Sequence, residues 1–134
     1  MLTIRDDQFS AFQEIAEDAF LDELCVLVRT DLAFWVENWE PDILRERVRS
    51  GIARARSHGL TGRASIARFV FPMVRFAPNF DEYPPIRALL LRQDISPEER
   101  AKRLLTDIPA KDWLAVEERF DPHAWLDFAS GEVL

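Results

Sequence analysis

The chain contains few of the residues on which metal, nucleotide and hydrolytic chemistry depend. Its single cysteine, Cys25, cannot form an internal disulfide, and its two histidines, His58 and His123, lie far apart. A histidine or cysteine metal site therefore has no plausible ligand set. The four glycines form neither a glycine-rich phosphate loop nor a Gly-x-Ser-x-Gly elbow. We expect no metal or cofactor, and an enzyme has little basis in the sequence.

Long apolar runs are also absent. The apolar stretches 24–28 and 66–74 are far shorter than the roughly 20 residues that span a bilayer. The first seven residues lack the basic and apolar regions of a secretory signal. We therefore expect no membrane partner and a cytoplasmic location. Cys25 lies in the first apolar stretch, where a buried and unreactive thiol is expected.

Large apolar side chains are plentiful. Of the 134 residues, 48% are hydrophobic, and they include ten phenylalanines and four tryptophans. This composition offers enough apolar surface to offset the chain entropy lost on folding, so disorder is not expected. The length is that of one domain, and we predict a single domain over residues 1–134, with 129–134 as a frayed tail.

Apolar residues recur at steps of three and four, which is the spacing of one helix face. No useful stretch alternates as a strand would. We predict an all-α fold, a compact bundle of about six helices. We predict a first helix over 6–27, whose extension toward Trp39 is left open, and a second over 42–57. A third helix is capped by Thr61 and kinks or ends early at Pro72. Shorter helices are predicted over 85–92, 97–106, 109–120 and 122–128. The predicted core contains Phe12, Phe20, Leu24, Val48, Ile52, Phe69 and Val70.

Two local motifs mark helix ends. Gly59 follows the second predicted helix, where a left-handed residue commonly ends a helix. The run 96–99, Ser-Pro-Glu-Glu, combines a cap, a proline at the first helical position and a glutamate at the third. The proline-rich stretch 77–85 predicts an ordered loop anchored by Phe80 and Tyr83.

Charge is segregated along the chain. The net charge of −7 divides into −8 over residues 1–40, +6 over residues 41–76 and −5 over residues 77–134. One interpretation pairs the arginines of the middle segment with Glu14, Glu17, Asp18 or Asp22. Another leaves some arginines free to meet an acidic protein surface. Nucleic acid is not expected, because the pI is about 4.8 and lysine is nearly absent.

Tryptophan and arginine are the commonest hot spots of protein interfaces. Trp35 and Trp39 are four residues apart, so a continued first helix would place both on one face. The candidate partner-binding residues are Trp35, Trp39, Arg45, Arg47, Arg49, Arg54 and Arg56. Core packing of the tryptophans is the alternative. A small metal-dependent hydrolase using Asp81 and Glu82 is a further alternative, although acids in such a loop are usually solvated or cap a helix.

Three parts of the chain carry a resemblance. They are LTIRDDQ at 2–8, GIARA with HGLT and IARF over 51–69, and PNFD at 78–81 followed by SPEER at 96–100. Together they resemble a family of small helical accessory proteins encoded in bacterial type VI secretion clusters, beside the spike protein and an adaptor chaperone. The resemblance covers residues 2–105, departs at Ser65 where the family has an acid, and ends after Asp107.

The resemblance implies an accessory role in secretion. A protein of this family would act as a co-chaperone that binds the adaptor chaperone and helps to load a toxic effector onto the spike. The same acidic, helical chain would also suit an immunity protein that neutralises a cognate toxin. The expected partner is therefore a protein, either the adaptor chaperone or the effector.

Overall fold

The computed structural model describes the backbone of residues 6–126 and the side chains of residues 16–126. Within this part of the chain every regular element is a helix, which confirms the predicted all-α fold. In chain order the elements are α1 (Asp6–Asp31), α2 (Ala33–Val36), α3 (Pro41–Ser57), α4 (Arg63–Arg75), the 3-10 turn η1 (Phe80–Glu82), α5 (Pro84–Leu90), α6 (Pro97–Thr106), α7 (Ala110–Glu118) and the 3-10 turn η2 (Pro122–Leu126). The predicted tail 129–134 lies outside the described residues.

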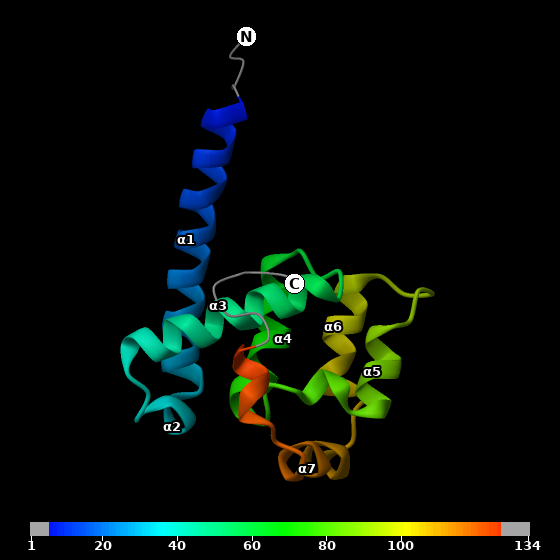
Figure 1. The fold of residues 1–134 in the computed structure, drawn as a ribbon. Helices are drawn as coiled ribbons and strands as arrows, with labels where there is room; N and C mark the ends of the chain where they lie inside the picture. Colours follow the sequence, from blue (N-terminus) through cyan, green and yellow to red (C-terminus); the bar gives the residue numbers. More distant parts are fainter. Residues whose placement is uncertain (1–5, 127–134) are drawn as a thin grey trace.

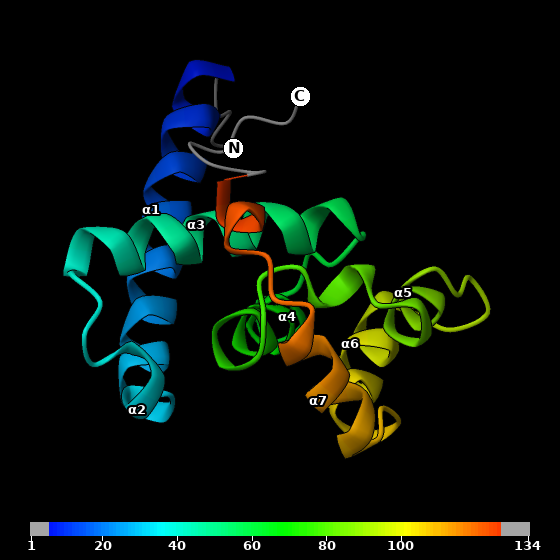
Figure 2. The same ribbon diagram turned by 60° about the horizontal axis from the view of Figure 1, so that its bottom comes forward.

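Helices α3 and α4 occupy the middle of the bundle. Helix α3 packs on α1 and on α4, and α4 packs in turn on α6 (Figure 1). Helices α5 and α7 lie on the side of α4 and α6 away from α1, as the turned view shows (Figure 2). The first turns of α1 project beyond the other helices. Among the described side chains, the first buried residue of α1 is Phe20.

The core contains the residues that the helical spacing predicts. Six of the seven predicted core side chains are buried, namely Phe20, Leu24, Val48, Ile52, Phe69 and Val70. The seventh, Phe12, belongs to a part of α1 whose side chains are not described. The same cluster takes in apolar residues from every later helix, including Phe80 of η1, Leu104 of α6 and Trp113 of α7.

Gly51 allows the close packing of α3 on α4. A Cβ atom at this position would lie 3.0 Å from Cγ2 of Val70 and 3.3 Å from Sδ of Met73. Such contacts are tighter than side chains normally make, so any larger residue would push the two helices apart.

The first helix ends earlier than the extension to Trp39 would require. Leu32 has φ −118° and ψ 30°, which breaks the helix before the short α2. The Arg29 side chain then donates hydrogen bonds to the carbonyl oxygens of Val36 (3.3 Å) and Trp39 (3.0 Å). These bonds hold the chain where it turns back, so the turn is stabilised by a side chain of the preceding helix.

The end of α3 follows its sequence signal. Gly59 has φ 83°, as predicted for a left-handed residue after the helix. Its N–H donates to the carbonyl of Arg56 (2.9 Å), and the Leu60 N–H donates to that of Ala55 (3.2 Å). These two bonds form a Schellman motif, and the fully buried Leu60 supplies its usual apolar contact.

The starts of α4 and α6 differ in how well the sequence predicts them. The prediction that Thr61 caps α4 is wrong, because Gly62 is the N-cap residue and no side chain caps the helix. At α6 the prediction is confirmed, since Ser96 Oγ accepts a hydrogen bond from the Glu99 N–H (3.1 Å). Helix α4 continues through Pro72 to Arg75, so the early end predicted at this proline does not occur.

Candidate protein-binding surface

The two tryptophans of the predicted surface lie in different surroundings. Helix α2 ends at Val36, before Trp39, so Trp35 and Trp39 do not share one helix face. Trp35 lies on α2, and the guanidinium carbon of Arg75 is 4.3 Å from the centre of a Trp35 ring. Trp39 packs edge to face against Trp125 of η2, with centroids 5.9 Å apart.

Trp35 belongs to an exposed apolar group and Trp39 does not. The Phe34 side chain is 76% exposed and Trp35 is 38% exposed, with ring centroids 5.3 Å apart. Trp39 is half-buried against the core, so the core-packing alternative fits it better.

Several arginines of the middle segment are paired with acids of α1. Arg45 bonds to Asp22, and Arg56 lies 3.2 Å from Glu17. These pairs agree with the interpretation that the basic segment packs beside acidic neighbours. Because both pairs are exposed, each contributes at most about 1 kcal/mol, and a partner could rearrange them at little cost.

Two other arginines keep charge available at the surface. Arg47 lies over the rings of Trp39 (4.4 Å) and Trp125 (5.5 Å), where burial lowers the pKa of its guanidinium. Arg49 is exposed, and no carboxylate among the described side chains pairs with it. Within the described side chains, Arg49 is the more accessible of these two charges, because Arg47 is half-buried against the tryptophans.

Arg54 is not a surface residue. Both Arg54 and Asp81 are only 5% exposed, and they form two parallel hydrogen bonds of 2.8 Å, from Nε to Oδ2 and from Nη2 to Oδ1. His58 Nε2 lies 2.7 Å from the same Oδ2, and Glu82 approaches Arg54 at 3.7 Å. Sequence reasoning missed this cluster, because it expected solvated acids in the loop. The only feature of the sequence that could have pointed to this cluster was the position of His58 at the end of α3.

The cluster keeps Asp81 ionised. Burial by itself raises the pKa of this carboxyl, but the hydrogen bonds from His58 and Arg54 outweigh burial and lower the pKa below its usual value. A carboxylate with both oxygens engaged is poorly suited to act as a general acid or base. Its evident role is to join the η1 loop to α3.

A groove separates α1 from the first turn of α3. It encloses about 390 Å³ and is lined by Cys25, Val26, Arg29, Thr30, Pro41, Asp42, Leu44 and Arg45. Cys25 is half-buried in its wall, which corrects the expectation of a buried thiol. Burial raises the pKa of Cys25, although the charge of Arg45 lowers it in part, so the thiol stays protonated at neutral pH.

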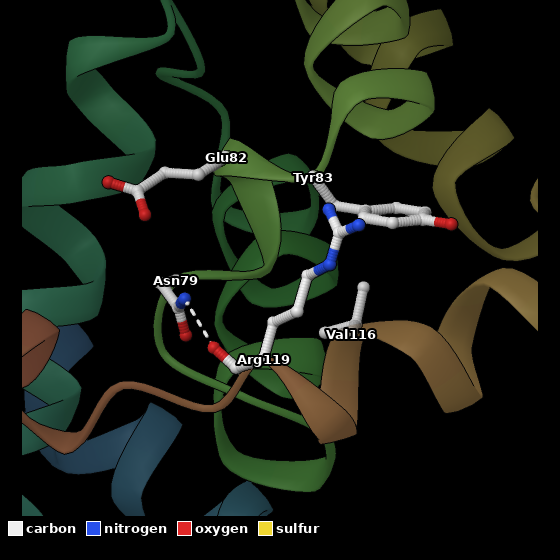
Figure 3. Close-up of a pocket in the computed structure, with 5 residues that line it drawn as sticks. All are labelled: Asn79, Glu82, Tyr83, Val116 and Arg119. Atoms are coloured by element: carbon white, nitrogen blue, oxygen red, sulfur yellow. Dashed lines mark hydrogen bonds between the residues drawn. The ribbon is translucent and has the colours of Figure 1, made fainter.

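A smaller pocket of about 220 Å³ lies between η1 and the end of α7 (Figure 3). Asn79 donates to the carbonyl of Arg119 (2.9 Å) and accepts from the Asp121 N–H (3.1 Å), while the Arg119 guanidinium covers the Tyr83 ring at 5.0 Å. Glu82 also lines this pocket, but its carboxylate points away from Tyr83 and Arg119. These contacts connect the η1 loop to the end of α7, and the pocket lies where these two elements meet.

The described side chains contain no group of three or more His, Cys, Asp and Glu residues that could hold a metal ion. Over residues 6–126, no helix combines the length and the apolar character that a membrane span requires. Comparison with family models, curated proteins and solved structures found no match for the chain.

Proposed function

We propose that this protein is a non-enzymatic accessory factor that binds another protein, acting as a co-chaperone for an adaptor chaperone in type VI secretion. The observation that carries the proposal is the exposed aromatic pair on α2, Phe34 and Trp35. Large apolar side chains side by side in water are characteristic of binding surfaces. The secretion context comes from the resemblance of residues 2–105.

The surroundings of Trp35 suit an interface anchor. The Arg75 guanidinium stacks on its ring and also contacts Glu117 of α7 at 3.0 Å, so the ring is held from one side and open on the other. A partially pre-ordered aromatic side chain loses little conformational entropy on binding. Trp35 is therefore the residue whose removal should weaken partner binding most.

The hydrolase alternative loses support from the geometry. Its two acids lie next to each other in sequence, but Asp81 is buried in the cluster with Arg54 and His58, whereas Glu82 is exposed. An acid and a base that act on one substrate must face the same space. We therefore do not propose catalysis at these residues.

The experiment is an affinity purification of the tagged chain from its native host, followed by titration of the pure chain against the adaptor chaperone that we expect to recover. We expect 1:1 binding that weakens at least tenfold in the variant Phe34→Ala with Trp35→Ala. The matched control is Leu105→Ala, which removes an exposed apolar side chain from α6. Equal affinity in both variants would refute the role of the aromatic pair.

The partner recovered in the purification separates the two binding functions. Recovery of the adaptor chaperone, with or without effector, supports the co-chaperone. Recovery of a toxin alone, which loses its activity on binding, would instead make the protein an immunity protein. In that case the acidic faces of the chain would be the place to search for the inhibitory contact.

A further inference from the structure

We propose that the groove between α1 and the first turn of α3 binds an acidic, amphipathic helix of the partner protein. One apolar side chain of that helix would enter the groove, and its carboxylates would meet Arg29 and Arg49. This inference rests on the proposed function, because it names the chemistry of the partner segment. Phe34 and Trp35 lie outside the groove lining, so the two surfaces can be tested separately.

The walls of the groove suit an apolar side chain. Val26 is 65% exposed on α1, and Cys25, Pro41 and Leu44 continue the apolar lining toward α3. A volume of about 390 Å³ is enough for a few side chains. A groove formed by two neighbouring helices is a common receptor for a third, amphipathic helix.

The rim of the groove has an excess of positive charge. The Arg29 guanidinium is held by the carbonyls of Val36 and Trp39, and none of the described carboxylates pairs with it. Arg49 is also without a carboxylate partner among those side chains. It lies one turn after Arg45 on α3, and its charge is near enough to Cys25 to lower the pKa of that thiol. Arg45 is compensated by Asp22, and Asp42 in the lining offsets one further charge, so the three arginines 29, 45 and 49 exceed the two acids by one positive charge.

The start of α3 adds to this attraction. Its N-cap residue, Glu40, makes no side-chain cap hydrogen bond, so no cap from that side chain satisfies the first-turn N–H groups that follow Pro41, which has none of its own. Pro41 and Asp42 of that first turn line the groove. The positive end of the helix dipole therefore favours a carboxylate there, and Asp42 offsets it only in part. An acidic partner helix satisfies these groups, whereas a basic helix would not.

The test is a selection of random 16-residue helical peptides displayed against the whole chain. We expect the selected peptides to carry net negative charge and leucine or phenylalanine at helical spacing. Alkylation of Cys25, the only cysteine, with iodoacetamide should weaken their binding at least tenfold. Bound peptide should in turn slow the reaction of Cys25 with a thiol reagent.

Matched variants distinguish the groove from general surface charge. Arg49→Glu should weaken the selected peptides at least tenfold, whereas Arg87→Glu, an exposed arginine of α5, should not. Val26→Glu and Leu105→Glu form the corresponding pair for the apolar wall. Neutral or basic selected peptides, binding that survives alkylation, or no selected peptide at all would overturn the inference. Concentration-dependent dimerisation that Val26→Glu abolishes would overturn it too, because the occupant would then be a second copy.

The outcomes separate this inference from the proposed function. If the adaptor chaperone binds Arg49→Glu as tightly as the unmodified chain, the function stands and the groove is not its contact. If acidic peptides occupy the groove while no adaptor chaperone binds, the groove stands and the secretion partner is wrong.

Discussion

Replacing Asp81 by asparagine should destabilise the fold far more than an ordinary surface substitution. The carboxylate and Arg54 are each 5% exposed and share two hydrogen bonds of 2.8 Å. Removing one partner of a buried ion pair costs about 3–5 kcal/mol, because a desolvated charge loses charge-assisted hydrogen bonds. Glu82 lies 3.7 Å from Arg54 but is exposed, so it contributes little to holding the guanidinium. We therefore expect a loss near the lower end, about 3 kcal/mol.

The assay is equilibrium urea unfolding at neutral pH, followed by circular dichroism. With an m-value of about 2 kcal/mol/M, a loss of about 3 kcal/mol lowers the midpoint by about 1.5 M. The matched control is Asp94→Asn, because Asp94 makes a similar two-bond pair with Arg92 but on the surface. Its midpoint should change little.

A double-mutant cycle tests the physical reason. Arg54→Met should also destabilise the chain, because it leaves Asp81 buried with His58 as its remaining partner among the described side chains. The double variant should lose less than the sum of the two single losses, by about 1–3 kcal/mol. A single loss for Asp81→Asn below about 1 kcal/mol, or strictly additive losses, would refute the argument that the pair is desolvated and coupled.

Three further predictions concern other parts of the fold. The pKa of Asp81 is lowered from 3.8, so its stabilising contribution is present above that pH and is lost as the pH falls toward the folded pKa. The urea midpoints of the unmodified chain and of Asp81→Asn should therefore converge in that acid range. A difference between the two midpoints that stays constant with pH would contradict this. Gly51→Ala should destabilise the chain by about 1 kcal/mol, because overpacking against Val70 outweighs the gain in helix propensity. Thermal melting measures this change, and a raised melting temperature would show that α3 and α4 adjust freely. Ser96→Ala should cost about 1 kcal/mol in the same melting experiment through loss of the α6 cap, and Ser96→Asp should preserve most of it.

The sequence by itself determined the features that depend on hydrogen bonds and spacing within a few residues. The left-handed Gly59 and the Ser96 cap are local motifs, and both form where the residues predict them. The spacing of apolar residues also identified the core side chains of α1, α3 and α4, because burial of one helix face follows from its periodicity. Thr61 shows the limit of a local motif, since a neighbouring glycine took the cap position.

Only the tertiary structure decided which charged and aromatic side chains remain available to a partner. Asp81 is buried because it meets Arg54, 27 residues earlier in the chain, and no local pattern reports such a distance. Trp35 and Trp39 are separated because Arg29 holds the turn between α1 and α3. Arg45 and Arg49 are both arginines on the same face of α3, but Asp22 pairs with Arg45 only. Pairing of this kind depends on how helices pack, and packing is set by contacts between parts of the chain that are far apart in sequence.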